Sequence, residues 1–260
     1  MNYIDTHSHF NLSQFDDDCD EAIARMEAHD TATICVGIDY ESSKLAVELA
    51  HKHASIWAII GQHPTDWGRE FEKNLFEALA DKPKVVAIGE CGLDYYRDRD
   101  RIGKEEQKKL FQMQIALAVE KNLPLMLHIR AQAGTMDAYD DALVILQQYK
   151  EQHPTMTGTA HFFAGDTRIA QAFLDLGFYV SFAGPITFAR DYDAAVRMVP
   201  LDRILSETDA PFAAPEPYRG TRCEPWHVVE TVKKIAEIKG VSLEEAQATL
   251  VENAKTLFRL

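Results

Sequence analysis

The stretch MNYIDTHSHF near the beginning of the chain places Asp5, His7 and His9 at alternate positions. Side chains at alternate positions of a β-strand point to the same side, so we expect these three to share one face of a first strand. Neutral imidazole is a good ligand for zinc and other transition ions, and carboxylates suit harder ions. The pattern predicts part of a metal site, although a His-x-His pair taken alone is more often an ordinary surface or core feature.

Further groups with the same chemistry follow other apolar runs. They are His63 in GQHP, Glu90 in GECGLD, His128 in LHIR, His161 in HFF and Asp209 in ETDAP. A carboxylate such as Glu90 can bridge two ions, and two ions together lower the pKa of a shared water to near neutrality. Each residue alone has a simpler interpretation, for example a buried histidine in a hydrogen bond, or Asp209 as a helix cap. Their common position after apolar runs predicts a two-metal centre.

The elements that must position these side chains form a regular series. Short apolar or β-branched runs, each typical of a buried strand, occur at residues 3–7, 33–38, 56–61, 85–89, 123–128, 159–163, 178–182 and 203–207. Segments with apolar residues at helical spacing lie between them. The alternation predicts an α/β fold, either a (β/α)8 TIM barrel or a doubly wound open sheet, and periodicity does not separate the two. In both, an active site lies at the carboxyl ends of the strands.

Composition narrows the class of protein. The chain has 260 residues, 46% hydrophobic and 26% charged, and we expect one domain spanning residues 1–260. We see neither a run of about 20 apolar residues nor a signal-peptide pattern, so we expect a cytoplasmic protein without membrane contact. The cysteines are scattered and predicted to be free thiols. The net charge of −14 argues against broad binding to nucleic acid, but not against a nuclease whose site holds cations.

The motifs DTHSHF, GQHP, GECGLDYY, LHIR, HFFAG, ETDAPF and the terminal NAKTLF occur in this order between residues 5 and 258. In this set the chain resembles the TatD-type metal-dependent deoxyribonucleases, which belong to the amidohydrolase-like TIM-barrel hydrolases. The resemblance implies a (β/α)8 barrel with the metal site at the carboxyl ends of the strands. It also implies an exonuclease that takes part in DNA repair or degradation.

The resemblance further implies a ligand set for two divalent ions. His7, His9 and Asp209 would hold one ion, Glu90 would bridge to the second, and His128 and His161 would complete the second site. Magnesium or manganese would support activity, with zinc or another transition ion as an alternative occupant.

Three residues are predicted to contact substrate. His63 resembles the family's accessory histidine near the substrate phosphate, and Arg130 is suited to hold a phosphate through paired N–H groups. Arg222 precedes Glu224-Pro225, where the family commonly has Arg-Asn-Glu-Pro, so Cys223 departs from that pattern. A second departure is AQAGTM after Arg130, which resembles an insertion of about six residues that either alters substrate entry or only lengthens a surface loop.

The predicted reaction is phosphodiester hydrolysis by a metal-bridged hydroxide, with Asp209 as general base, Glu90 bridging the ions, and Glu207 supporting the site. The partner would be DNA, as single strands or chain ends, with Tyr95 and Tyr96 either stacking on bases or packing on the barrel rim. A monomer is the default state.

Two alternatives remain open at this stage. The same two-metal barrel supports hydrolysis of another ester, an amide or a small phosphodiester, because fold does not fix function. A metal with a purely structural role is the other alternative, and the predicted bridging carboxylate argues against it.

Overall fold

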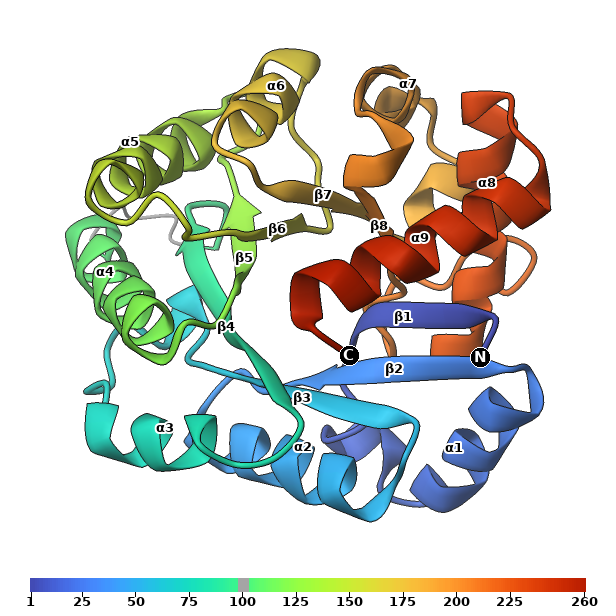
Figure 1. Cartoon of the computed structure of the whole chain (residues 1–260), viewed down its shortest axis with the longest axis horizontal. Coiled ribbons are helices and arrows are strands. Elements are labelled where there is room, and N and C mark those ends of the chain that lie inside the picture. Colours follow the sequence, from blue (N-terminus) through green and yellow to red (C-terminus); the bar gives the residue numbers. More distant parts are fainter. Residues whose placement is uncertain (98–102) are drawn as a thin grey trace.

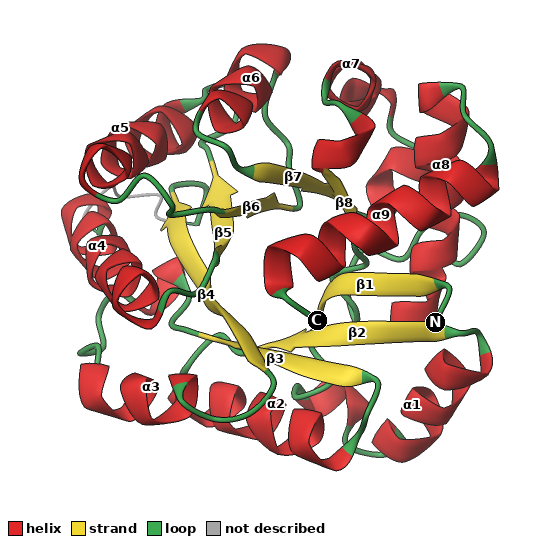
Figure 2. Ribbon diagram, viewed as in Figure 1, coloured by secondary structure: helices red, strands yellow, loops and turns green. Residues whose placement is uncertain are grey.

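The computed structural model describes residues 1–97 and 103–260. Eight parallel strands alternate with helices and pair in sequence order, β1 to β8, around a nearly closed barrel (Figures 1 and 2). The strands are β1 (Tyr3–Ser8), β2 (Thr31–Val36), β3 (Ile56–Ile60), β4 (Val85–Asp94), β5 (Leu125–Arg130), β6 (Gly158–His161), β7 (Tyr179–Phe182) and β8 (Ile204–Ser206). A β-bridge between Ser8 and Ala210 joins the two ends of the sheet. The (β/α)8 barrel is therefore confirmed, and the open sheet is excluded.

The helices surround the barrel. They are α1 (Cys19–Ala28), α2 (Tyr40–Lys52), α3 (Lys73–Ala80), α4 (Lys104–Lys121), α5 (Asp137–Gln152), α6 (Thr167–Asp175), α7 (Asp193–Met198), α8 (Val228–Lys239) and α9 (Leu243–Phe258), with short 3₁₀ turns such as η2 (Pro64–Asp66) and η4 (Arg190–Tyr192). Local sequence explains their limits. Asp166, for example, caps α6 by accepting the N–H of Ile169 at 2.8 Å. Within the described residues, no helix has both the length and the apolar character needed to span a bilayer.

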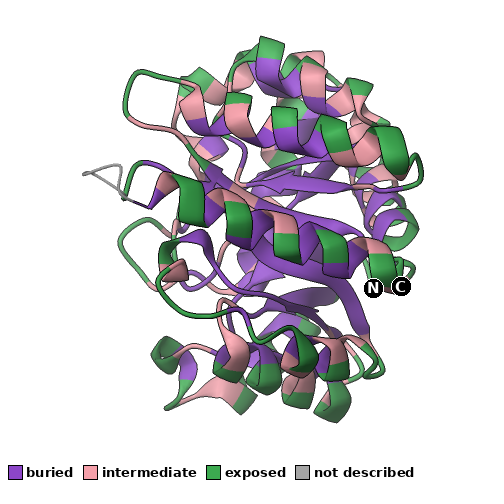
Figure 3. Cartoon of the chain, turned by 90° about the vertical axis from the view of Figure 1, so that its left-hand side faces the viewer, coloured by how far each residue is buried: buried purple, intermediate pink, exposed green. Residues whose placement is uncertain are grey.

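Apolar side chains fill two layers, and the strands are buried while the outer helix faces are exposed (Figure 3). The outer layer packs between strands and helices; Ile169 and Phe173 of α6 contribute to it, and each such buried side chain contributes about 1.5–3 kcal/mol. The inner layer fills the barrel near the starts of the strands. There Leu257 and Phe258 of α9 pack with inward-facing strand residues. Because α9 covers this end, the opposite end, where the strands finish, is left to form a site.

Two strands contain an extra residue where ligand candidates occur. The register of β1 against β2 shifts between Asp5 and Ser8, and that of β4 against β5 shifts between Ile88 and Cys91. Such bulges turn the following side chains to a new direction. The expectation that Asp5 shares a face with His7 and His9 is wrong, because the extra residue places Asp5 and Ser8 on the same side of β1.

The bulge in β4 depends on Gly89, whose φ is +154° and where a Cβ would lie 2.4 Å from the Met126 carbonyl oxygen. The chain continues past this point in register with β5 as far as Asp94. The predicted strand 85–89 is therefore too short, and Glu90 lies within β4 rather than after it.

Asp5 joins the first strand to the segment after the last one. Its Oδ1 accepts the backbone N–H of Thr208 at 2.9 Å, and its Oδ2 accepts the Thr208 hydroxyl at 2.6 Å. Nearby, the N–H of Asp209 donates to the His7 carbonyl at 2.9 Å, and the N–H of His9 donates to Ala210 at 2.7 Å. Burial raises the pKa of Asp5, although these hydrogen bonds lower it. These contacts between β1 and residues 208–210 form what we call the seam, and the seam holds His7, His9 and Asp209 together.

We predict that Asp5→Ala lowers the free energy of unfolding by on the order of 3 kcal/mol, because it leaves the buried donors of Thr208 without an acceptor. Urea unfolding monitored by circular dichroism measures the change. Asp17→Ala, which removes an exposed carboxylate from the loop before α1, is the matched control and should leave stability unchanged. Equal stability of both variants would show that Asp5 does not hold the seam.

Candidate metal centre

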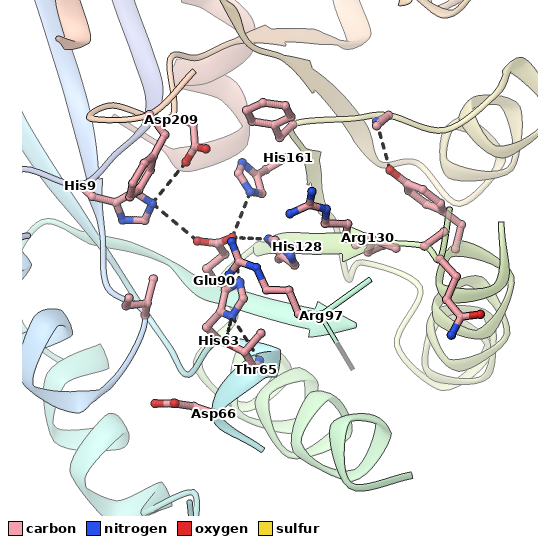
Figure 4. A pocket seen from close by; sticks show the side chains of 18 of the residues that line it. His9, His63, Thr65, Asp66, Glu90, Arg97, His128, Arg130, His161 and Asp209 are labelled. Carbon is pink, nitrogen blue, oxygen red and sulfur yellow. Dashed lines mark hydrogen bonds and ion pairs between the residues drawn. The ribbon is translucent and has the colours of Figure 1, made fainter. Parts of the chain in front are cut away.

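A cavity of about 890 Å³ opens at the carboxyl ends of the strands. Its lining brings together residues that are far apart in sequence, and Figure 4 shows them pointing toward one another: His9, His63, Glu90, His128, His161 and Asp209. His7 lies beneath this group and is fully buried. The structure thus gathers at one rim every side chain predicted to ligate metal.

The first cluster lies at the seam. The Nε2 atoms of His7 and His9 are 3.1 Å apart, and Asp209 Oδ1 lies 3.7 Å from the former and 3.4 Å from the latter. Asp209 has φ +63°, a left-handed conformation that is uncommon for aspartate outside turns and special sites. Three atoms with lone pairs therefore converge on a common point.

Glu90 lies between this cluster and a second one. Its Oε2 is 3.4 Å from His7 Nε2, whereas its Oε1 is 2.6 Å from His128 Nδ1 and 3.0 Å from His161 Nε2. Each carboxylate oxygen faces a different set of imidazoles. A carboxylate in this position can bridge two ions.

The residues fit a divalent metal centre by the chemistry of their donors. Ligand atoms of His7, His9 and Asp209, and separately those of His7, Glu90 and His161, lie within 4.8 Å of one another. His7, His9, His161 and Glu90 are buried and His128 and Asp209 are partly buried, which is costly unless their charges are compensated. Imidazole with carboxylate is a donor set that suits zinc and manganese, and the carboxylates also suit magnesium.

The electrostatics of the cluster favour ionised carboxylates. Burial alone would raise the pKa of Glu90, but His161 and His128 hold it well below its usual range. The pKa of Asp209 is likewise lowered by the hydrogen bond with His9, against the effect of burial. Burial would lower the pKa of His161, yet the charges of Glu207 and Glu90 raise it well above its usual value. Protons on these imidazoles balance the negative charge of the carboxylates. A bound metal ion would displace these protons.

Outer residues fix the orientation of the imidazoles. Glu207 Oε1 accepts from His161 Nδ1 at 3.2 Å, and its Oε2 accepts the Ser181 hydroxyl at 2.6 Å. His9 Nδ1 donates to the Val36 carbonyl at 2.9 Å. In both histidines the proton is therefore held on Nδ1 and Nε2 is directed to the cluster, as in most metal-binding histidines. Glu207 supports the site as the sequence predicts.

His63 differs from the other imidazoles. Its Nδ1 accepts the backbone N–H of Thr65 at 3.2 Å, so in the neutral ring the hydrogen is on Nε2, 3.7 Å from Glu90 Oε1. Burial and the neighbouring His128 lower the pKa of His63 to about 3, so the ring is neutral. In this tautomer Nε2 donates a hydrogen bond and offers no lone pair, and His63, Glu90 and His128 are close enough to form a further group of possible ligands.

The predicted substrate residues have different positions. Arg130 lines the cavity, with its guanidinium 4.0 Å above the Tyr96 ring. Arg222 is not among the described residues of the lining; it pairs with Asp18 at 2.6 Å and with Glu224 at 3.1 Å. The structure therefore does not bring Arg222 together with the others.

The two tyrosines after Asp94 also differ. Tyr95 is buried and donates to Asp141 at 2.8 Å, which is packing on the rim, whereas Tyr96 is 45% exposed. The segment 131–136 after Arg130 forms one wall of the cavity.

Sequence reasoning missed the role of Asp94. Its Oδ2 lies 3.1 Å from His128 Nε2, so this carboxylate orients the ring that faces Glu90. The sequence signals this role only by placing a carboxylate a few residues after an apolar run. Because the predicted strand ended at residue 89, Asp94 was not expected at the end of β4.

The comparisons with known proteins agree with this geometry. The family model described as TatD related DNase matches residues 4–259. The protein named uncharacterized metal-dependent hydrolase YabD, from Bacillus subtilis, is 41% identical over 262 aligned residues that cover 99% of each chain. The protein named 3′-5′ ssDNA/RNA exonuclease TatD, from Shigella flexneri, is 32% identical over 257 residues, 95% of each. The crystal structure of the TatD homologue YjjV from Escherichia coli superposes with a TM-score of 0.90 at 26% identity, covering 100% of this chain and 98% of that one.

We predict that Glu207→Gln weakens binding of Mn²⁺ or Zn²⁺ by about 10- to 100-fold, because His161 loses the carboxylate that orients it. Isothermal titration of metal-stripped protein measures this affinity. Glu48→Gln, which changes an exposed carboxylate on α2, is the control. Unchanged affinity in a folded Glu207→Gln protein would contradict the supporting role.

Proposed function

The chain belongs to the TatD-related DNase family and is a metal-dependent hydrolase, and on this premise we propose that it is an exonuclease acting on unpaired ends of DNA. The observation that carries the proposal is the position of Glu90 between two imidazole clusters, with Arg130 on the same cavity wall. A two-ion site suits an in-line displacement at phosphorus, and a neighbouring guanidinium suits the charge of the phosphate.

We assign the ligands as the family resemblance implies. His7, His9 and Asp209 would hold one ion, and His128 and His161, both in contact with Glu90 Oε1, would hold the other together with Glu90. Two ions, Mg²⁺ or Mn²⁺ in the active protein, would neutralise charge on the phosphate and lower the pKa of a water.

The chain's own groups supply the remaining functions. Asp209 is the best-placed base, because its carboxylate is kept ionised and opens to the cavity. Arg130 would offer the edge of its guanidinium to a phosphate oxygen, while Tyr96 stacks on its face. The Nε2–H of His63 is available to donate to a further phosphate oxygen.

The substrate class rests on the relatives. The Shigella protein is named for activity on single-stranded DNA and RNA, and the family description names a DNase. An exonuclease holds a chain end and does not coat a duplex, which is compatible with a net charge of −14. We propose that the protein acts as a monomer in the cytoplasm.

We predict that metal-stripped protein leaves end-labelled single-stranded DNA intact and that Mg²⁺ or Mn²⁺ restores a ladder of shortened products. Labels at the 5′ and 3′ ends distinguish the direction of digestion, and an RNA strand of the same sequence tests the sugar preference. Asp209→Asn should abolish the ladder while the protein remains folded. Stoichiometric metal binding without cleavage of either strand would contradict the nuclease and favour another ester or amide as substrate.

We predict that Arg130→Ala lowers kcat/KM for DNA by roughly 10- to 100-fold, mainly through KM, since charge-assisted hydrogen bonds contribute about 1.5–3 kcal/mol. Steady-state kinetics on a short labelled strand measures the two constants. Arg168→Ala, which removes an exposed guanidinium paired with Asp140 on the outer helices, is the control. If KM were the same in both variants, Arg130 would be a rim residue without a substrate contact.

A further inference from the structure

The chemistry of the cavity wall changes around the barrel. Segments after β2 and β3 contribute charged groups, including Asp39, Asp66 and Arg69. Segments after β5, β6 and β7 contribute apolar and aromatic groups, namely Met136, Tyr139, Phe162, Ala164 and Tyr192. These strands are neighbours in the sheet, so the second set forms one continuous sector, which we call the aromatic sector.

Contacts within the aromatic sector show that its members are adjacent. The Tyr139 hydroxyl accepts the N–H of Ala164 at 3.1 Å. Burial raises the pKa of Tyr139, and the nearby Tyr192 raises it further. Phe162 and Tyr192 are only partly buried, and Ala164 is exposed, so this apolar surface faces the open cavity.

Phe162 occupies its position under backbone constraint. Its φ is +44°, in the left-handed region that is a genuine outlier for a bulky side chain. Its N–H donates to Glu207 Oε1 at 2.5 Å, so the carboxylate that orients His161 also fixes the backbone of the next residue. The Phe162 ring centroid lies 6.0 Å from that of His161. Strained residues that survive in a structure cluster at binding and catalytic sites.

The segment 131–136 closes the outer side of the aromatic sector, and its position is fixed. Asp137 Oδ1 accepts the backbone N–H of Gln132 at 3.1 Å and the Thr135 hydroxyl at 2.8 Å. Asp137 Oδ2 accepts from Lys104 Nζ of α4 at 2.8 Å. The wall that holds Met136 is therefore tied to two helices and is formed before any ligand arrives.

Arg130 lies at the boundary between the metal cluster and the aromatic sector. It is two residues after His128 on β5, and Figure 4 shows it beyond His128 on the side away from Asp209. A phosphate held between Arg130 and the metal cluster would place the group attached to it in the aromatic sector. Flat aromatic bases stack on such side chains whatever their sequence.

We propose that the aromatic sector binds the base of the terminal nucleotide, so that the hydrolase selects a phosphodiester carrying a heterocyclic base over a small phosphodiester. The inference rests on the proposed exonuclease function and deepens it. Phe162 and Tyr192 supply the stacking surface, Met136 closes the outer side, and Arg130 holds the phosphate. Segment 131–136 is then a specificity element, not only a lengthened loop.

The test compares three substrates that share the same leaving group, p-nitrophenol. The metal-loaded protein is given thymidine 5′-p-nitrophenyl phosphate, its 3′ isomer, and methyl p-nitrophenyl phosphate, which has no base. We expect Tyr192→Leu and Phe162→Leu each to lower kcat/KM for the preferred nucleoside substrate by about 5- to 150-fold, the range that stacking of one base supplies. Tyr192→Leu should leave the methyl ester unaffected, and Phe162→Leu should lower its hydrolysis less than that of the nucleoside substrate. Tyr149→Leu, on the part of α5 remote from the cavity, is the matched control.

Equal losses on the nucleoside and methyl substrates, or no loss on either, would overturn the proposal. A binding measurement distinguishes the base site from the proposed exonuclease function. Thymidine 5′-monophosphate should bind more tightly than deoxyribose 5-phosphate, and Tyr192→Leu should remove this difference in affinity. If no phosphodiester is cleaved but this difference is found, the exonuclease fails and the base site stands. If DNA is cleaved and the two ligands bind equally well, the base site fails and the exonuclease stands.

Discussion

The hydrogen bonds of Asp5 with Thr208 are the interaction on which the rest of the structure depends. They join β1 to the segment after β8 across 203 residues of sequence, which turns a sheet into a nearly closed barrel. His7 and His9 lie just after Asp5, and Asp209 lies just after Thr208, so the same contacts that close the barrel assemble one half of the metal centre. Stability and chemistry are therefore coupled at this seam, and a residue that touches no metal ligand atom decides whether the ligands meet.

The metal centre is built from irregularities in otherwise regular strands. A regular β1 would turn Asp5, His7 and His9 to one side, and the extra residue between Asp5 and Ser8 separates the structural carboxylate from the imidazoles. A similar shift in β4 occurs at Gly89, directly before Glu90, where only glycine fits beside the Met126 carbonyl. Bulges occur often beside active sites because they re-aim a side chain while the strand continues to pair. The ends of β1 and β4 thus combine a rigid scaffold with side-chain directions that a regular sheet cannot provide.

Local patterns in the sequence were sufficient to predict an α/β fold and the gathering of ligand candidates, and the resemblance to a known family favoured the barrel over the open sheet. Apolar runs mark the strands, and the residues after them must meet at one rim of a parallel sheet. The sequence was insufficient where the interaction partner of a side chain lies far away along the chain. The guanidinium of Arg222 pairs with Asp18, and nothing around Arg222 signals that carboxylate. The role of Asp94 was hidden because a bulge lets β4 run on to Asp94. A bulge changes the face of a side chain without changing the apolar pattern, so periodicity does not reveal it.

The acidic character of the chain bears on how the proposed exonuclease would recognise a polyanion. The net charge of −14 opposes the approach of DNA, and screening confines this repulsion to about 8–10 Å at physiological salt. Some of the cavity's arginines are partly balanced by neighbours, since Arg69 faces Asp39 and Asp66 and Arg97 faces Asp94. Attraction at a distance is therefore weak, and binding must come from short-range contacts: the metal ions, the edge of Arg130 and the aromatic side chains. Such contacts act only on a strand end that enters the cavity. In the proposed exonuclease, an acidic net charge combined with such a cavity therefore favours the processing of chain ends over attachment along a duplex.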